Sequence, residues 1–232
     1  MLSTAVIMMT KLPIPGFCKN RLNEVLDASE SAEFQRRCIA DLAATVQLTS
    51  LPLHIYYAGP GQDAQLESLF ESGKVLFFPQ KGEDLGRRMY NAVHKTLGCY
   101  EAVLVVGSDL PDLEPGIFQK AVRELEKADL VVGPCLDGGY YLLGVRGDYP
   151  EIFEEISWSS PRVLEQTLEK AQRAGLSFCL LETRRDIDTW NDIVDYYNRN
   201  AGVSSTDAYA YAGLLMDKYD SAKRGALRWT KG

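Results

Sequence analysis

Short apolar segments rich in β-branched and aromatic residues alternate with longer segments of helical periodicity along the chain. This alternation is typical of β-α-β units around a largely parallel sheet, and it constrains the fold more than any other feature of the sequence. The apolar segments are nearly continuous, which predicts strands buried on both faces. The expected strands are residues 4–9, 53–58, 75–78, 102–106, 129–133, 140–145 and 177–181.

Polar capping residues mark five helices between and after these strands. Asp27 and Glu30 have the spacing of a capping pair before the first helix, in which apolar residues recur at every fourth position. The other four helices are expected to begin at Asp84, Glu114, Ser160 and Thr189. The sequence therefore predicts an α/β fold.

The 232 residues suffice for one large domain with an appendage. A boundary is expected at the small and polar stretch 201–206, so that residues 1–200 form the main domain and residues 201–232 a C-terminal helical extension or tail. Two interpretations of the extension stay open. It is either a peripheral helix with a frayed end, or an arm that binds a partner or joins copies into a homo-oligomer.

Charge and cysteine content argue against several classes of protein. Lys and Arg number 25 against 32 Asp and Glu, and the net charge of −7 argues against capture of nucleic acid or an anionic membrane by charge alone. Five widely spaced cysteines without a C-x-x-C pair suggest neither a disulfide framework nor a zinc module. No segment has the roughly eighteen apolar residues that a membrane span needs. We expect a cytoplasmic protein with no membrane span and no nucleic-acid partner.

A loop with three cations follows the first expected strand. Lys11, Lys19 and Arg21 lie in this loop, and Pro15 and Gly16 stiffen it. Ligands of α/β sheets bind at the carboxyl ends of the strands, and a polyphosphate would use several cations together. The loop therefore predicts a phosphate-binding site, although a solvated basic loop explains the same residues.

Two acidic residues follow other strands. Asp109 comes just after the strand 102–106, and Asp188 lies past the strand 177–181, where a helix begins. Mg²⁺ is usually held by one or two carboxylates together with substrate phosphates, so the two residues would form a metal site if the sheet brings them together. Alternatively, Asp109 caps a turn and Asp188 belongs to a helix start.

The segment Asp137-Gly138-Gly139-Tyr140 is the last candidate. Paired glycines let a backbone approach a ligand closely, while Asp137 would contact hydroxyl groups and Tyr140 would pack on a sugar or base. A turn between two strands explains the same four residues. The two interpretations are compatible with each other.

Six segments occur in an order that resembles one bacterial family: PGFCKNRL, GEDLGRRM, GSDLPDL, GPCLDGGYYLLG, ISWSSPRVLEQT and DIDTWND. The family consists of glycosyltransferase-A-fold proteins known as radical-SAM/selenodomain-associated or arsenosugar-biosynthesis transferases, and the resemblance covers residues 4–200. More distantly, the chain is similar to the phospholactate and molybdenum-cofactor guanylyltransferases. The resemblance implies a three-layer nucleotide-diphospho-sugar transferase fold with a mostly parallel mixed sheet.

The same resemblance implies roles for individual residues. Asp109 and Asp188 would hold the metal, Mg²⁺ or Mn²⁺. The residues implied to bind the nucleotide and its phosphates are Lys11, Pro15, Gly16, Lys19, Arg21, Gln80 and Gly86. Those implied to face the sugar or acceptor are Asp137, Gly138, Gly139 and Tyr140.

Three functions remain open. The leading hypothesis is metal-dependent transfer of a glycosyl group from a nucleoside-diphosphate sugar to a small acceptor, with Asp109, Asp137 and Asp188 as catalytic residues and Asp137 as the general base. The second is a nucleotidyltransferase that couples an NTP to a phosphorylated small molecule and releases pyrophosphate. The third is a non-catalytic nucleotide-binding scaffold whose C-terminal arm engages a partner.

Overall fold

The computed structural model describes residues 2–60, 64–67, 69–70 and 75–229. Over these residues the chain forms a seven-stranded sheet of order β3-β2-β1-β4-β6-β5-β7. All seven expected strands are confirmed, and no strand end differs from its expected position by more than two residues. The strands are β1 (Thr4–Lys11), β2 (Leu53–Ala58), β3 (Val75–Pro79), β4 (Ala102–Gly107), β5 (Leu130–Pro134), β6 (Tyr140–Val145) and β7 (Phe178–Leu180).

The sheet is mixed and mostly parallel, which confirms the expected class. Only β6, in the described part of the sheet, runs antiparallel to its neighbours β4 and β5. β1 lies between β2 and β4 and is parallel to both, with Met9 paired to Gly107. The carboxyl ends of β1 and β4 therefore meet at one edge, where α/β sheets bind their ligands.

The helices connect and cover the strands. Asp27 and Glu30 form the predicted capping box, and Thr189 caps a helix together with Asp192. The helix expected from Ser160 starts three residues later, because residues 160–162 form a turn. The helices are η1 (Asn20–Glu24), α1 (Ala28–Leu48), α2 (Ala64–Glu67), α3 (Leu85–Leu97), α4 (Pro115–Leu125), η2 (Pro150–Ile152), α5 (Val163–Arg173), α6 (Trp190–Arg199) and α7 (Asp207–Trp229).

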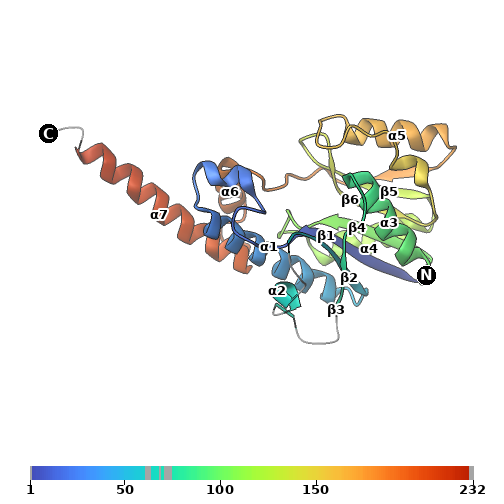
Figure 1. The fold of residues 1–232 in the computed structure, drawn as a ribbon, viewed down its shortest axis with the longest axis horizontal. Helices are drawn as coiled ribbons and strands as arrows, with labels where there is room; N and C mark the ends of the chain where they lie inside the picture. Colours follow the sequence, from blue (N-terminus) through green and yellow to red (C-terminus); the bar gives the residue numbers. More distant parts are fainter. Residues whose placement is uncertain (1, 61–63, 68, 71–74, 230–232) are drawn as a thin grey trace.

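Helices cover both faces of the sheet (Figure 1). Successive residues of β1 point to opposite faces: Val6 and Met8 pack with residues of α1 and α4, whereas Ile7 packs with residues of α3 and α5. All three side chains are fully buried. The expectation that the strands are buried on both faces is confirmed for this central strand.

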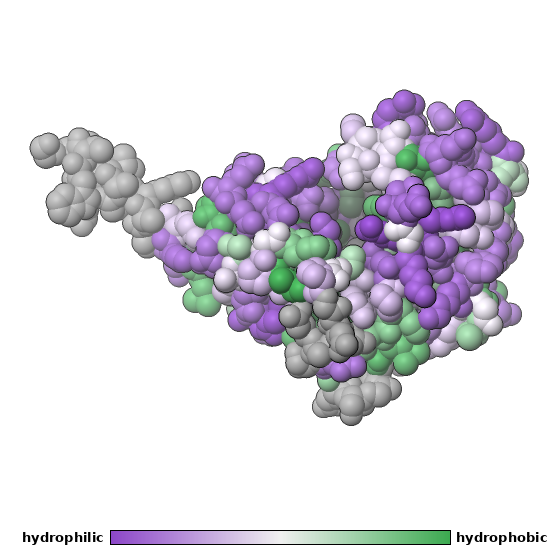
Figure 2. All heavy atoms as spheres, in the orientation of Figure 1, coloured by the Kyte–Doolittle hydropathy of each residue, from purple (hydrophilic) through white to green (hydrophobic). Residues whose placement is uncertain are grey.

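Two clusters of buried hydrophobic residues lie on the two faces of the sheet, and a third hydrophobic cluster joins α7 to the main body. Ala208, Ala212 and Leu215 of α7 pack against a group from η1, α1 and α6 that includes Phe34 and Tyr196. The distal part of α7 reaches away from the rest of the chain (Figure 1). Hydrophilic side chains cover most of the face drawn in Figure 2.

Candidate active site

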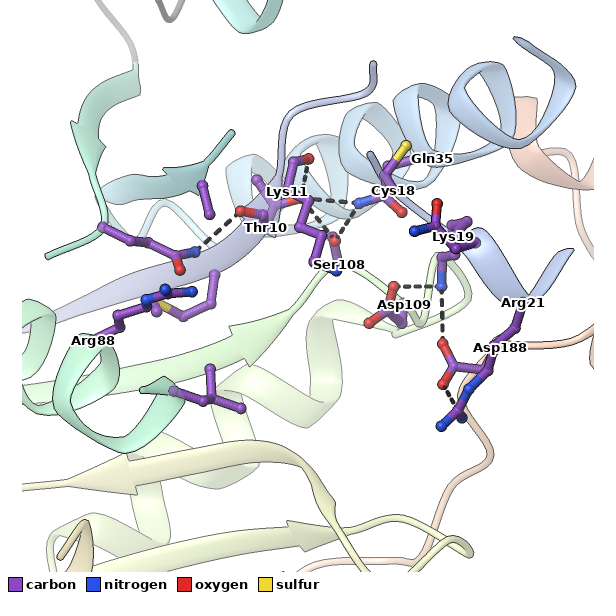
Figure 3. A pocket seen from close by; sticks show the side chains of 15 residues that line it. Thr10, Lys11, Cys18, Lys19, Arg21, Gln35, Arg88, Ser108, Asp109 and Asp188 are labelled. Carbon is purple, nitrogen blue, oxygen red and sulfur yellow. Dashed lines mark hydrogen bonds and ion pairs between the residues drawn. The ribbon is translucent and has the colours of Figure 1, made fainter. Parts of the chain in front are cut away.

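One ammonium group lies between two carboxylates where β1 and β4 end (Figure 3). Lys19 Nζ forms an ion pair with Asp109 Oδ1, lies 3.7 Å from Asp188 Oδ1, and donates a hydrogen bond to the carbonyl oxygen of Ile187. The Lys19 side chain is 3% exposed, whereas those of Asp109 and Asp188 are 40% and 41% exposed. The two acidic residues therefore converge, as expected, and the cation between them belongs to the chain itself.

Local backbone geometry produces this convergence. Lys19 has a left-handed backbone with φ of 49°, directly before η1. The Ile187 amide donates to the carbonyl oxygen of Asp109 at 3.1 Å, which ties the segment before α6 to the end of β4. The fully buried Ile187 side chain packs in the third hydrophobic cluster. In an extended chain the neighbouring side chains, Asp186 and Asp188, point to the opposite side, toward the sheet edge.

The charge on Lys19 is strongly stabilised. Burial opposes ionisation of the ammonium, but the carboxylates of Asp109 and Asp188 outweigh it, and the pKa of Lys19 is raised above its ordinary value. Arg21, which is exposed, adds a second cation through its guanidinium 3.1 Å from Asp188 Oδ2. Two cations of the chain thus neutralise the two carboxylates.

A cavity of about 470 Å³ opens beside this group on the side of β1. Four cations line it, Lys11, Lys19, Arg21 and Arg88, against the two carboxylates of Asp109 and Asp188. Gln80 also lines it and is held by hydrogen bonds from Nε2 to the carbonyl oxygens of Thr10 and Tyr56, at 3.0 and 2.9 Å. We call this space the cationic cavity. Its excess of positive charge suits a polyphosphate.

A buried hydroxyl network forms the floor of the cationic cavity (Figure 3). Thr10 Oγ1 and Ser108 Oγ lie 2.9 Å apart, and Gln35 Nε2 donates to them at 3.0 and 2.8 Å. These three side chains join the ends of β1 and β4 to α1. Gln35 Nε2 is satisfied by the two hydroxyls, whereas Gln35 Oε1 is buried and has no hydrogen-bond partner among the described residues.

A second cavity of about 560 Å³ lies on the side of β4 and β6. It shares Asp109, Asp188 and Arg21 with the first, and Asp137 adds a third carboxylate, so acids outnumber cations by three to one. The remaining wall is mainly apolar and aromatic, including Met9, Met89, Val105, Tyr140 and Trp158. We call this space the acidic cavity.

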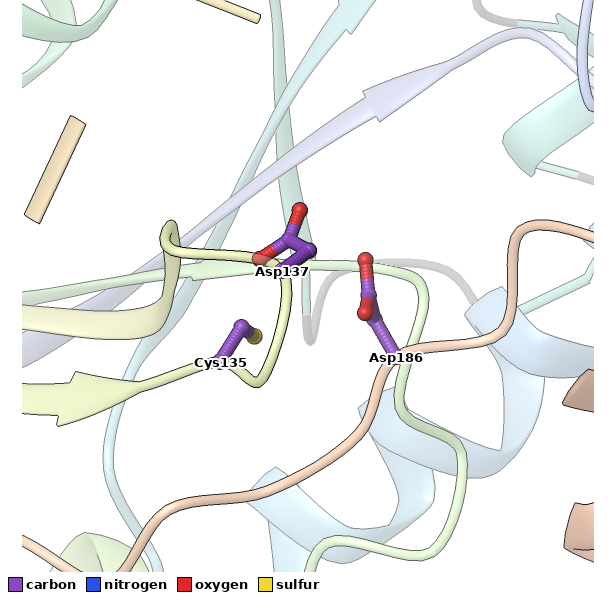
Figure 4. A group of neighbouring side chains, drawn as sticks. All are labelled: Cys135, Asp137 and Asp186. Carbon is purple, nitrogen blue, oxygen red and sulfur yellow. The ribbon is translucent and has the colours of Figure 1, made fainter. Parts of the chain in front are cut away.

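Asp137 and Asp186 form an acidic pair next to the thiol of Cys135 (Figure 4). One ligand atom from each of the three side chains lies within 4.8 Å of the others, a spacing that would suit a metal ion. Burial, followed by the charges of Asp137 and Asp188, raises the pKa of Asp186 to about 6. Within the described part of the chain, no Lys or Arg pairs with either carboxylate.

The chain brings these groups together through two strand ends. Residue 135 forms an isolated parallel bridge with residue 184, and Arg184 donates its amide to the carbonyl oxygen of Pro134 at 2.9 Å. The β5–β6 turn places Asp137, whose Oδ1 accepts from the Gly139 amide at 2.8 Å. The turn and the ligand-facing interpretations of this segment are thus compatible, because Asp137 lines the acidic cavity from within the turn.

Several residues implied by the resemblance lie elsewhere. Pro15 and Gly16 are exposed and shape the loop without lining either cavity. Gly86 is buried against Trp158, since a Cβ there would lie 2.4 Å from the indole Nε1. Gly138 has φ of +88° and turns its Cα toward the Pro161 carbonyl oxygen. None of these four residues lines either cavity.

Tyr140 contributes its ring and not its hydroxyl. The residue lines the acidic cavity, but the hydroxyl oxygen is buried and has no hydrogen-bond partner in the described structure. Burial raises the pKa of Tyr140. A ligand in the acidic cavity would therefore meet an aromatic face.

Sequence reasoning missed Asp186, Cys135 and Arg88 as site residues. The signal for Asp186 was present, because residues 186–188 spell D-x-D and alternate residues of an extended segment share a side. No local pattern marks Cys135, whose partners are 2 and 51 positions away. Arg88 lies one turn inside α3, and only the tertiary arrangement places it in the cavity.

Comparison with known proteins identifies the family. The family model described as "Uncharacterized protein conserved in bacteria (DUF2064)" matches residues 41–160. The chain belongs to this family. This DUF2064 protein is also similar to the crystal structure of a candidate nucleotide-diphospho-sugar transferase from Desulfovibrio desulfuricans G20. That similarity has a TM-score of 0.87 and 32% identity, and covers 94% of this chain and 99% of the other.

More distant similarities concern the fold alone. A cytidylyltransferase from Leptospira borgpetersenii has a TM-score of 0.57 at 12% identity, over 95% of this chain and 96% of that chain. The Rv0371c protein of Mycobacterium tuberculosis H37Rv, in complex with manganese, has a TM-score of 0.51 at 13% identity, over 87% of this chain and 100% of that chain. No curated protein matches the sequence. The nucleotide-diphospho-sugar transferase fold of this DUF2064 protein is thus confirmed.

None of the helices in the described residues is both long enough and apolar enough to cross a bilayer.

Proposed function

We propose that this protein transfers a glycosyl group from a nucleoside-diphosphate sugar to a small acceptor in a metal-dependent reaction. The observation that carries the proposal is the meeting of two cavities of opposite charge at Asp109 and Asp188. A nucleotide sugar has the matching form, because its anionic diphosphate lies between the nucleoside and a neutral sugar. The bond that breaks would lie at the junction.

The cationic cavity would bind the nucleotide diphosphate. Lys11, Arg21 and Arg88 bring positive charge to its wall, and Arg side chains bind phosphate oxygens through two parallel hydrogen bonds. Asp109 and Asp188 fit a divalent cation such as Mg²⁺ or Mn²⁺, because their oxygen donors converge and stay about 40% exposed. A cation bound there would stabilise the charge that develops on the leaving diphosphate.

The acidic cavity would bind the sugar and the acceptor. The faces of Tyr140 and Trp158 offer apolar surface on which a sugar ring packs. Asp137 would accept the proton of the acceptor hydroxyl in an inverting transfer. The oxygen of that hydroxyl would form the bond to the anomeric carbon while the bond between the anomeric carbon and the diphosphate breaks. Asp186, whose pKa is about 6, lies beside Asp137 and is suited to share that proton near neutral pH.

Nucleotidyl transfer is the second candidate, because cytidylyltransferases share the fold. It would require a phosphorylated second substrate next to the nucleotide. The acidic cavity has three carboxylates and one Arg, and that Arg already pairs with Asp188. Repulsion between these carboxylates and a phosphate favours glycosyl transfer. The six sequence segments resemble the radical-SAM/selenodomain-associated transferases, and we propose that the protein belongs with them.

A thermal-shift screen of nucleotide sugars and NTPs, with and without Mn²⁺, tests the proposal, since a ligand that binds only the native state raises the melting temperature. Turnover of the hits is then measured by the release of nucleoside diphosphate and by the release of pyrophosphate. We expect a nucleotide sugar to release nucleoside diphosphate, and we expect this release to be lost in Asp109→Asn. Asp148→Asn is the matched control, because Asp148 is similarly exposed at 44% but pairs with His94 outside both cavities. Pyrophosphate release from an NTP would refute glycosyl transfer.

A further inference from the structure

We propose that Lys19 is a built-in counter-ion that occupies the metal position between Asp109 and Asp188, so that the free protein binds the metal weakly and takes it up together with the nucleotide. The proposal rests on the proposed function for the identity of the ligands. Lys19 would thus oppose metal binding until the nucleotide is present, in addition to its expected place beside the phosphates.

The first step concerns the donors and acceptors. An ammonium has three N–H groups, and three oxygens surround Lys19 Nζ, namely Asp109 Oδ1, Asp188 Oδ1 and the Ile187 carbonyl. A divalent cation held by Asp109 and Asp188 would need two of the same oxygens. The ammonium and the metal therefore compete for one position.

The second step concerns burial and charge. Lys19 is 3% exposed, so its attraction to the carboxylates is weakly screened by solvent. Together with Arg21 it balances the charge of both carboxylates. A divalent cation that enters this neutral group meets two positive charges at short range, and that repulsion disfavours binding.

The third step concerns the nucleotide. A diphosphate in the cationic cavity adds negative charge beside Lys19, Arg21 and the metal position at once. It gives the ammonium other oxygens to pair with, which releases Asp109 and Asp188 for the metal. Metal and nucleotide then increase each other's affinity, and linkage requires the two factors to be equal.

The Asp137–Asp186 pair provides an internal contrast. No Lys or Arg of the described residues pairs with either of these carboxylates. A metal bound there would not compete with Lys19 for a ligand oxygen. The test must therefore assign each binding event to one of the two groups of carboxylates.

The test measures free Mn²⁺ by electron paramagnetic resonance in titrations of the nucleotide-free protein. Lys19→Met is expected to bind Mn²⁺ at least about tenfold more tightly than the natural chain, or 1.4 kcal/mol. The gain must disappear in Lys19→Met/Asp109→Asn. Lys11→Met is the matched control, because Lys11 lines the cationic cavity but pairs with neither carboxylate in the described structure. Equal or weaker Mn²⁺ binding by a folded Lys19→Met protein overturns the proposal.

A second measurement covers the case in which Lys19→Met does not fold. The natural chain is titrated with Mn²⁺ alone and with each of UDP, GDP, CDP and ADP. We expect at least one diphosphate to tighten Mn²⁺ binding, and Mn²⁺ to tighten that diphosphate by the same factor. Micromolar binding of Mn²⁺ alone that is lost in Asp109→Asn overturns the proposal. Neither result depends on turnover, so the absence of glycosyl transfer would count against the proposed function only.

Discussion

Replacing Asp186 by asparagine is expected to stabilise the protein at neutral pH and to change its stability little at pH 4. Burial first, and then the nearby charges of Asp137 and Asp188, raise the pKa of Asp186 from 3.8 to about 6. Between these values the folded protein keeps a proton that the unfolded chain releases. The contribution of Asp186 to stability is therefore most favourable below pH 3.8, decreases between pH 3.8 and about 6, and changes no further above that range.

The size of the effect follows from the same values. A difference of about two pH units, at 1.36 kcal/mol each, corresponds to about 3 kcal/mol once both states are ionised. The amide of asparagine carries no charge and so avoids this cost. We expect the free energy of unfolding to rise by about 1–3 kcal/mol at pH 7.5 and by less than about 0.5 kcal/mol at pH 4.

Urea denaturation followed by circular dichroism at the two pH values measures the difference. Glu83→Gln is the matched control, because it removes one exposed carboxylate outside this group. Equal effects at both pH values, or a loss of stability at pH 7.5, would refute the reasoning. Turnover should fall in Asp186→Asn while stability rises, as is common where a functional site stores unfavourable charge.

Three further predictions concern the scaffold. Gly138→Ala should cost about 3 kcal/mol or more in urea denaturation, because φ is +88° and the new Cβ would lie 2.0 Å from the Pro161 carbonyl oxygen; a neutral effect would contradict the turn geometry. Asp41→Ala should cost about 1 kcal/mol, since Asp41 accepts hydrogen bonds from the first two amides of α7, and hydrogen exchange of α7 should accelerate. Truncation after Ala201 should cause aggregation in size-exclusion chromatography, because α7 covers the third hydrophobic cluster; a monomeric, active product would show that α7 is dispensable.

The strands and most helix starts follow from local residue order. Continuous apolar runs such as residues 102–106 are stable only when buried on both faces, so their position in the sheet is readable without coordinates. The capping box of Asp27 and Glu30 is equally local, because its hydrogen bonds join residues three apart. The start of α5 was misplaced because the turn at residues 160–162 depends on contacts with the β5–β6 turn, where Leu164 donates to the Gly138 carbonyl oxygen.

The candidate site also has features that the sequence predicts and features that only the tertiary structure decides. The sequence alone predicts that Asp109 and Asp188 follow strands and that the loop after β1 is cationic. In a parallel sheet the carboxyl ends of the strands lie at one edge, so these residues are expected to be near one another. Whether Lys19 faces a phosphate or the two carboxylates depends on its left-handed backbone and on the Ile187 carbonyl, 168 positions away. The closeness of Asp137 and Asp186 depends on a bridge between residues 135 and 184. Sequence patterns report interactions between near neighbours, whereas the charge balance of this site arises from groups that only the packed sheet brings within a few ångströms.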